Sequence, residues 1–350
     1  MRYIQTEILY VDRKAQSLQD VNKIKEAALW IRNNEVVAFP TETVYGLGGN
    51  AFSNEAIEKI YQAKGRPSDN PLIVHIAKRE QLHDFVREIP RLAEQLMDAF
   101  WPGPLTLVLP TSGALATKVT ANLPTVAVRM PEHPVALALI EAAGVPVAAP
   151  SANLSGKPSP TTAEHVEKDL SGRIRAIVDG GKTGVGVEST VVDCTESVAM
   201  ILRPGGITKE EIEEVVGIVH TDPALSEDNI APKSPGVKYT HYAPKAPLYL
   251  VDGNVIQIQR LIDDKKREGL KVGLLTTVER VDLYDADSVI ACGSRESLDT
   301  VASELYASLR RFDEKELDIL YSEVFMKEGL GIAIMNRLEK ASGGQLITFP

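Results

Sequence analysis

Cysteine is nearly absent from this chain, whose 350 residues include only Cys194 and Cys292. Two cysteines fit neither a disulfide framework nor the ligand spacing of a zinc site. Long apolar runs are missing too. No uninterrupted stretch approaches the roughly 18–20 apolar residues that span a membrane, and the first twelve residues, MRYIQTEILYVD, hold no apolar signal core. These absences predict a cytoplasmic protein without membrane contact.

Basic charge is the second deficit. The chain has 38 Lys and Arg against 48 Asp and Glu, a net charge of −10, and both of its halves are acidic. Such a chain is not a general polyanion binder, so any contact with nucleic acid must be a local patch. The sequence also shows no Ser/His/acid set in a nucleophile-elbow context. Catalysis is therefore expected to work by positioning and charge stabilisation, as in phosphoryl and nucleotidyl transfer.

What is present is an alternation of apolar strands and amphipathic helices, with 44% hydrophobic residues to build a core. Ser17 and Asn54 are plausible caps of two of the helices, and Thr208 with Glu211 has the pattern of a capping box. The pattern predicts a mixed, twisted α/β sheet with helices on its faces. Strands are expected over 36–39, 72–76, 104–110, 125–130, 145–150, 176–180, 189–193 and 199–204, and helices over 17–35, 54–64, 90–100, 133–144, 160–170 and 207–217.

A Pro-rich segment separates two parts of the sequence. Residues 221–247 hold five of the 21 prolines, too many for a helix or a central strand. After this segment, apolar strand candidates again alternate with helix candidates, which predicts a second, smaller domain with three layers. The expected organisation is a catalytic domain over 1–217, a Pro-rich linker over 218–247 and a C-terminal α/β domain over 248–350.

The segment KGRPSDNPLIVH (64–75) gathers polar side chains between a helix and a strand. Lys64 and Arg66 would repel each other unless an anion lies between them, and Arg offers a planar fork that suits phosphate or carboxylate. Asn70 adds a neutral donor. A solvated charged loop that pairs with Asp69 is the alternative.

Polar side chains also follow several apolar strands, where α/β sheets form their ligand crevices. Arg129 lies in the strand TVAVRM, whose Val126 and Val128 should face the core, so the guanidinium needs an anionic partner. PTETVYGLGGN (40–50) is either part of this crevice or a tight strand-to-helix turn, and AIVDGGKT (176–183) lacks the first glycine of a P-loop. The pattern favours a cleft for a polyanion and a small zwitterion. The other side chains of this kind are Thr41, Thr43, Tyr45, Ser151, Asn153, Ser155, Ser159, Ser189, Thr190 and Arg203.

Seven motifs occur in order over residues 36–206: FPTETVYGLG, KGRPSDNPLIVH, WPGPLT, TVAVRMP, PSANLSG, GVEST and LRPG. Together they closely resemble the threonylcarbamoyl-adenylate synthase (YrdC-like) family. The linker SPGVKYTHYAP and the C-terminal part resemble the two-domain form of that family, the latter by position more than by residue pattern.

The resemblance implies a YrdC-like twisted sheet with a concave cleft, plus a smaller Rossmann-like domain. It implies a nucleotidyltransferase that joins L-threonine, bicarbonate or CO2, and ATP into threonylcarbamoyl-AMP and pyrophosphate. The product would pass to a partner transferase complex that modifies tRNA, and a weak contact with tRNA itself is left open.

The resemblance also implies roles for residues. Lys64 and Arg66 would be catalytic and would hold the ATP phosphates, with Mg²⁺ sharing the charge. The linker, through Tyr239, would fold back over the cleft as a lid. The ATP site would comprise Arg66, Asn70, Thr125, Ser151, Ser159, Arg203 and Tyr239, and the threonine site Thr43, His75, Arg129, Ala149 and Ser189.

Three alternatives stay open. A carbamoyl-transferring enzyme of the hydrogenase-maturation kind resembles this family in one domain, but this chain has no C-x-x-C. An RNA-binding module without turnover is opposed by the acidic charge and the lack of aromatic platforms. The C-terminal domain has either a ligand of its own, between KVGLLTT and SVIACGS, or a docking role.

Overall fold

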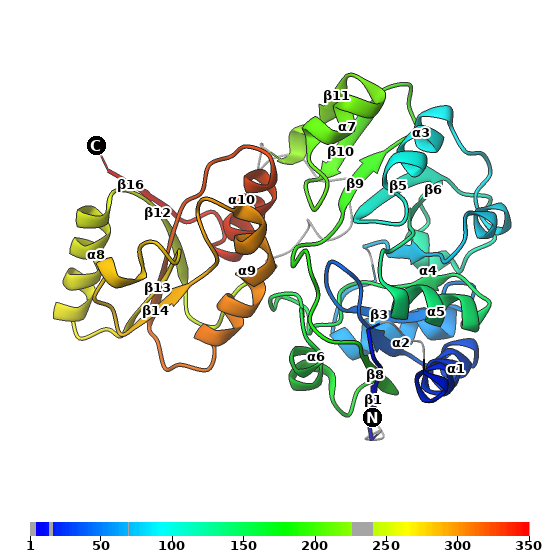
Figure 1. Ribbon diagram of the computed structural model, residues 1–350, viewed down its shortest axis with the longest axis horizontal. Coiled ribbons are helices and arrows are strands. Elements are labelled where there is room, and N and C mark those ends of the chain that lie inside the picture. The colour runs from blue at the N-terminus through cyan, green and yellow to red at the C-terminus, as the bar shows by residue number, and fades with distance from the viewer. Residues whose placement is uncertain (1–4, 14–16, 69, 226–240, 350) are drawn as a thin grey trace. The chain divides into compact units, whose positions relative to one another are not determined.

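The structure is a computed structural model that describes residues 5–13, 17–68, 70–225 and 241–349 (Figure 1). The chain divides into two compact units, and each has its own sheet. The first unit comprises Met1–Ser155, Pro160–Gly184 and Glu188–Lys238, and the second comprises Gly156–Ser159, Val185–Val187 and Tyr239–Pro350.

The first unit is built on an eleven-stranded mixed sheet in the order β1-β8-β2-β3-β7-β4-β6-β5-β9-β10-β11. Parallel pairs such as β4 with β6 stand beside antiparallel pairs such as β5 with β6. The predicted mixed α/β sheet is therefore confirmed. Its strands are β1 (Glu7–Tyr10), β2 (Val37–Phe39), β3 (Gly46–Asn50), β4 (Ile73–His75), β5 (Leu105–Pro110), β6 (Thr125–Arg129), β7 (Val147–Ala148), β8 (Ala176–Asp179), β9 (Thr190–Asp193), β10 (Ala199–Arg203) and β11 (Val219–Thr221).

The helices of this unit begin largely where their caps predicted. Ser17 caps α1, and Thr208 and Glu211 form the expected capping box of α7. The predicted cap Asn54 is wrong: Ser53 accepts from the Ala56 amide, and Asn54 is already helical. The helices are α1 (Leu18–Arg32), α2 (Asn54–Lys64), α3 (Arg91–Phe100), α4 (Thr117–Thr120), α5 (Pro134–Ala143), α6 (Ala163–Leu170) and α7 (Lys209–Val216), with 3₁₀ turns η1 (Arg79–Asp84) and η2 (Pro223–Leu225).

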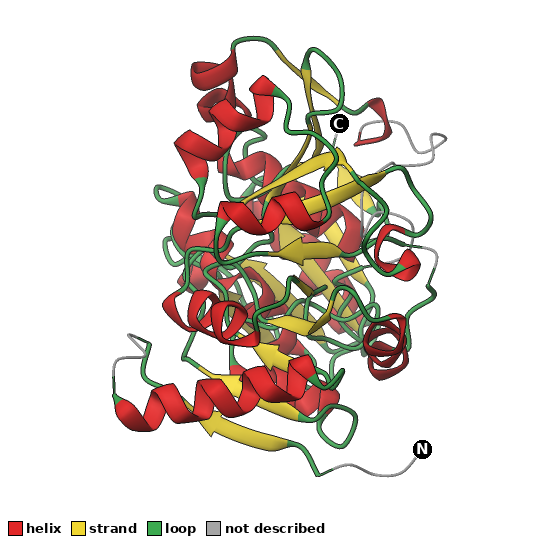
Figure 2. Ribbon diagram, turned by 90° about the vertical axis from the view of Figure 1, so that its right-hand side faces the viewer, coloured by secondary structure: helices red, strands yellow, loops and turns green. Residues whose placement is uncertain are grey.

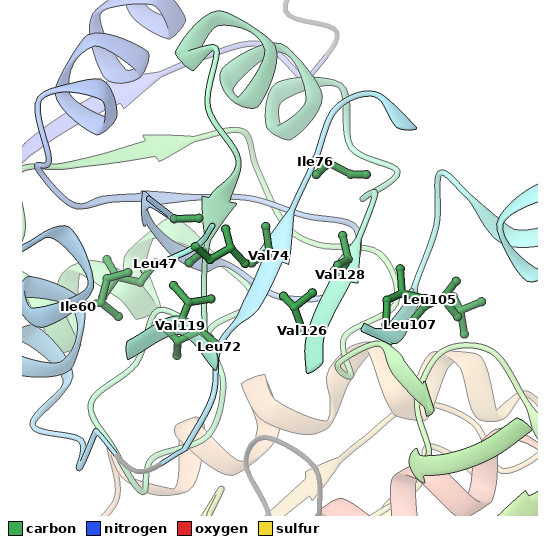
Figure 3. Packing of buried hydrophobic residues seen from close by; sticks show 14 of the residues in the cluster. Leu47, Ile60, Leu72, Val74, Ile76, Leu105, Leu107, Val119, Val126 and Val128 are labelled. Carbon is green, nitrogen blue, oxygen red and sulfur yellow. The ribbon is translucent and has the colours of Figure 1, made fainter. Parts of the chain in front are cut away.

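The sheet has a different core on each face, because side chains alternate along a strand. Val37 and Phe39 pack with α1 and α5, whereas Ala38 between them packs with the helices of the opposite face. Figure 3 shows the second of these cores, where Val74, Val128 and Leu107 lie together on three adjacent strands. The valines beside Arg129 thus face the core as predicted.

Two segments differ from the sequence-based expectation. Residues 46–50 are not a strand-to-helix turn but strand β3, which pairs with β2 as a hairpin. Gly48 allows this close packing, because a Cβ there would lie 2.7 Å from a ring carbon of Phe39. At the other end, the first residues of the predicted linker form β11, which pairs with β10, and turn η2. Residues 226–240 of that linker lie outside the described ranges.

The second unit has a five-stranded sheet, all parallel, in the order β14-β13-β15-β12-β16. Helix α8 covers one face and α9 and α10 the other, so the predicted three layers are present (Figure 1), and Figure 2 shows such strands between helices. Its elements are β12 (Leu248–Asp252), α8 (Val255–Arg267), β13 (Val272–Thr276), η3 (Val281–Leu283), β14 (Ser288–Ala291), α9 (Leu298–Phe312), β15 (Ile319–Glu323), α10 (Leu330–Ala341) and β16 (Leu346–Thr348).

Candidate functional site

One half of a sheet face in the first unit carries the polar residues of the candidate site. Among the described residues, the apolar cluster on this half consists of strand residues, which include Ile73, Ala127 and Val108. Two residues further along the same strands, His75 pairs with Arg129 in register, and Arg129 pairs with Thr106. Because side chains two apart share a face, these three side chains form a row on β4, β6 and β5.

Arg129 is held on three sides. Its Nη2 lies 2.6 Å from Oε1 of Glu42, its Nη1 donates to the Thr43 hydroxyl at 2.9 Å, and its Nε donates to the Gly103 carbonyl. Thr43 is held in turn by the Thr41 hydroxyl at 2.8 Å. The loop after β2 therefore supplies both a carboxylate and a hydroxyl to this guanidinium. The sequence-based prediction of an anionic partner for Arg129 holds, and the partner inside the chain is Glu42.

His75 is buried next to Arg129 and packs edge-on against Phe39, with ring centroids 6.1 Å apart. Among the residues that the structure describes, its Nδ1 has no hydrogen-bond partner. Burial, helped by the neighbouring Arg129 charge, lowers the pKa of His75 to about 3. The ring is therefore neutral at physiological pH and can accept or donate a hydrogen bond without adding charge.

Ser189 lies at the other end of the row, just before β9. Its hydroxyl is 2.7 Å from that of Thr106. Arg203, at the end of β10, donates to the Ser189 carbonyl through Nε and Nη2 and to its hydroxyl at 3.2 Å. The structure thus brings the predicted residues Ser189 and Arg203 together, with Thr106 as a link to Arg129.

Lys64, the last residue of α2, reaches the loop after β7. Its ammonium donates to the Ser151 carbonyl at 2.6 Å, the Asn153 carbonyl at 2.8 Å and Oδ1 of Asn153 at 3.3 Å. The Ser151 hydroxyl also donates to Asn153, at 2.6 Å. These three oxygens carry no net charge, and they hold the ammonium in place.

Arg66 and Asn70 are joined by a longer contact, because Nη2 of Arg66 lies 3.4 Å from the Asn70 carbonyl. The Tyr61 hydroxyl donates to the same carbonyl at 2.9 Å and anchors the segment on α2. Gly65 between the two cations has φ 61°, a left-handed conformation that glycine adopts without strain. This turn lets the chain leave the helix directly after Lys64.

The remaining predicted residues have different positions. Thr125 begins β6 on the same face as Arg129, and the buried Ala149 donates its amide to the Ile73 carbonyl. Ser159 belongs to the short segment 156–159 of the second unit, and Tyr239 lies outside the described residues. Tyr45 is engaged structurally, because its hydroxyl donates to the Gly181 carbonyl at 2.7 Å and burial raises its pKa.

Sequence reasoning missed two members of this site. Glu42 stands inside PTETVYGLG, where the hydroxyl residues drew the prediction and the carboxylate between them did not. Thr106 reads as one residue of an apolar strand. A carboxylate next to a strand end and a lone threonine at an alternating position were the only available signals, and neither is specific.

Two general features of the described residues bear on the site. Across those ranges, no three His, Cys, Asp or Glu side chains come together in a group that could hold a metal ion. None of the helices in the described parts is long and apolar enough to cross a bilayer.

Comparisons with known proteins cover nearly the whole chain. The Sua5/YciO/YrdC family model, described as "Telomere recombination", matches residues 30–205, and a model described as "Threonylcarbamoyl-AMP synthase, C-terminal domain" matches residues 207–343.

Individual relatives match over similar lengths. The chain is 56% identical to the threonylcarbamoyl-AMP synthase of Bacillus subtilis, over 98% of this chain and 100% of that protein. The protein of the same name from Pyrococcus abyssi is 50% identical, over 93% and 95% of the two chains. The crystal structure of P. abyssi Sua5 complexed with L-threonine matches with a TM-score of 0.92 and 48% identity, over 99% of this chain and 100% of that one.

Proposed function

Because this chain belongs to the two-domain threonylcarbamoyl-AMP synthase family, we propose that it is a nucleotidyltransferase that makes threonylcarbamoyl-AMP and pyrophosphate from L-threonine, ATP and bicarbonate or CO2. The observation that carries the proposal is the likeness over 98% of the chain to a synthase of that name. The polar row on the sheet of the first unit supports it, since it offers a cation, hydroxyls and a neutral imidazole to a small zwitterion.

The threonine site lies along that row. Arg129 takes the threonine carboxylate, because a guanidinium suits a planar anion. Thr43 and His75 contact the rest of the amino acid, and the Ala149 backbone and Ser189 complete the pocket. Support comes from the contacts of Thr43 with Arg129, and from the register that places His75 beside it.

The ATP site comprises the cations at the end of α2 and residues of nearby loops. Lys64 and Arg66 hold the phosphates, with Asn70 as a neutral donor. Mg²⁺ would arrive bound to ATP, because Mg²⁺ is commonly held through substrate phosphates. The nucleotide side is lined by Thr125, Ser151, Ser159 and Arg203.

The reaction has two steps. The threonine amine bonds to the carbon of CO2 and loses its proton, which gives an N-carboxylate; when bicarbonate is the donor, one water is released. An oxygen of this carboxylate then attacks the α-phosphorus of ATP in line, and the bond from that phosphorus to the pyrophosphate oxygen breaks. Lys64 and Arg66 stabilise the charge that develops on the leaving pyrophosphate.

The product would be consumed by a transferase complex that places the threonylcarbamoyl group on a tRNA adenosine. That use is consistent with a cytoplasmic location, and a weak tRNA contact would serve the transfer. The net charge of −10 favours turnover over a role as an RNA-binding module.

The test is pyrophosphate release from ATP by the purified chain, with and without L-threonine and bicarbonate. Release that requires both substrates is expected. Release without threonine would point to another acceptor. No release, together with salt-sensitive tRNA binding, would favour the RNA-binding alternative.

A further inference from the structure

Glu42 is a buried carboxylate, and the family resemblance implied no role for it. It is 6% exposed, and Arg129 beside it is 4% exposed. Their atoms Oε1 and Nη2 lie 2.6 Å apart. Neither carboxylate oxygen of Glu42 has a hydrogen-bond partner of good geometry, and neither has Nη2 of Arg129. Among the described residues, Arg129 is thus the one cation that contacts this carboxylate, which can accept about four hydrogen bonds.

Such a carboxylate is costly unless further donors reach it. Buried polar atoms in proteins are almost always hydrogen-bonded, and an unsatisfied ionised group costs more than a neutral one. The backbone of Glu42 is fixed, since the Gly184 amide donates to its carbonyl at 3.0 Å. The two carboxylate oxygens therefore project from an anchored backbone position, and the side chain is buried from solvent.

The charged and titratable groups around Glu42 do not supply the missing donors. Arg129 on β6 uses its other nitrogens on Thr43 and Gly103. His133, which precedes α5, is fully buried, and neither of its ring nitrogens has a partner. Burial and the charge of Arg13 lower the pKa of His133 to about 4, against the opposing pull of Glu42, so the ring is neutral. Within the described ranges, then, no donor besides Arg129 reaches Glu42, and the ammonium of a ligand would supply one.

We propose that Glu42 holds the amino group of L-threonine while Arg129 holds its carboxylate. The head group of an α-amino acid carries an ammonium and a carboxylate one carbon apart, and a carboxylate in contact with a guanidinium is its charge complement. The inference rests on the proposed function and adds a residue to it. Glu42 positions the nitrogen, which attacks CO2 after the ammonium has released a proton to solvent, and it selects ligands that carry an amine.

The alternative for Glu42 is a purely structural role, in which it only neutralises and orients Arg129. Two ligands separate the roles: L-threonine and (2S,3R)-2,3-dihydroxybutanoate, which keeps the carboxylate and the side-chain hydroxyl but has a hydroxyl in place of the amine. Their dissociation constants are measured by calorimetry on the full chain and on its Glu42→Gln variant, which keeps the shape and removes the charge.

We expect the wild-type chain to bind L-threonine about 10–100-fold more tightly than the analogue, the range for one charged hydrogen bond. In Glu42→Gln the ratio should fall close to one, mainly because threonine binds less well. If Glu42 only orients Arg129, both ligands weaken together and the ratio stays; that result would overturn the inference.

Two further variants serve as a control and as a substitute for Glu42→Gln in this experiment. Glu141→Gln removes an exposed carboxylate that pairs with Lys78, and it should keep the wild-type ratio. If Glu42→Gln does not fold, Glu42→Asp keeps the charge one methylene shorter and should retain the preference for the amine; an Asp variant that loses it would contradict the proposal.

Different results would overturn the proposed function and the proposed role of Glu42. A wild-type chain that binds neither ligand and releases no pyrophosphate overturns the proposed function and this inference with it. A chain that turns over L-threonine, but whose Glu42→Gln variant keeps the ratio, overturns the inference alone.

Discussion

Lys64 illustrates what a single residue contributes here. The sequence predicted a cation at a helix end, and the structure shows that its ammonium contacts two carbonyls and one amide oxygen of residues 151–153. An ammonium fixed by neutral oxygens needs little reorganisation when negative charge develops near it, and this is how preorganised groups lower a barrier.

Replacing Lys64 by Ala should slow threonine-dependent pyrophosphate release by about 10²–10³-fold, the scale for losing one preorganised charge-stabilising group. Steady-state kinetics would measure it. Lys59→Ala on the same helix is the control, because Lys59 pairs with Glu35 and Glu55 and should leave the rate unchanged. An unchanged rate in Lys64→Ala would remove that residue from the mechanism.

His133 makes a prediction about acid stability. Its pKa is about 4 in the folded chain and about 6.5 when unfolded. The unfolded chain therefore binds more protons between these values, so stability falls as the pH drops from about 6.5 towards 4. His75, with a folded pKa of about 3, acts in the same direction.

Between pH 6.5 and 4, the free energy of unfolding should fall by roughly 2–3 kcal/mol less in His133→Leu than in the wild type, because leucine has no proton to bind. No hydrogen bond is sacrificed, since both ring nitrogens lack partners. Denaturant unfolding at several pH values would measure the slope, with His83→Leu as the exposed control. Equal slopes in His133→Leu and the wild type would contradict the assignment.

At the scale of elements, the sequence located helices better than strands. Ser17 and the Thr208–Glu211 box fix helix starts through bonds within four residues, and such local signals can be read directly. Short strands such as β1 and β3 have no such signal, because β1 pairs with β8 and β3 pairs with β7, both from distant parts of the chain. PTETVYGLGGN was therefore interpreted as either part of a ligand crevice or a strand-to-helix turn, and its strand was not predicted.

Ser189 precedes β9 and Gly205 follows β10, so both residues lie at the same end of this antiparallel pair, opposite the turn that connects the strands. Gly205, just after β10, packs on that segment: a Cβ there would lie 2.3 Å from the Thr190 nitrogen and 2.4 Å from the Glu188 carbonyl oxygen. These are backbone atoms, which cannot move aside as a flexible side chain can. The site therefore depends on the absence of a side chain at this position.

Gly205→Ala should destabilise the chain by about 1–3 kcal/mol, the usual cost of overpacking, and should weaken threonine binding. Denaturant unfolding and calorimetry would measure the two effects. Gly184→Ala is the matched control for stability, because its nearest contact would be an ordinary 3.8 Å. A Gly205→Ala chain as stable as the wild type would show that the two strands can separate at no cost.

At the scale of the whole molecule, the hydrophobic clusters of the two units can be compared within the described residues. The clusters of the first unit contain no residue of the second sheet, whose own core joins α8 to β12, β13 and β15. Both tryptophans, Trp30 and Trp101, belong to the first unit. Tryptophan fluorescence therefore reports on that unit alone, whereas far-UV circular dichroism reports on both.

Ile262→Ala truncates a fully buried side chain of α8 and should cost the second unit about 2–5 kcal/mol. Part of the circular dichroism transition should move to lower denaturant while the fluorescence midpoint stays. Leu96→Ala in the first unit should shift the fluorescence instead. A fluorescence midpoint that moves with Ile262→Ala would mean that the two units unfold as one.

The sequence by itself determined the helices with local caps, the alternation of apolar and polar positions, and the chemical kinds of side chain at the strand ends. The tertiary structure alone decided which of these side chains meet. Register across β4, β6 and β5 aligned His75, Arg129 and Thr106, and the loop after β2 placed Glu42 against Arg129. The physical reason is range: caps and periodicity act within a few residues, whereas Glu42 and Arg129 are far apart in the chain and only the folded sheet brings them together.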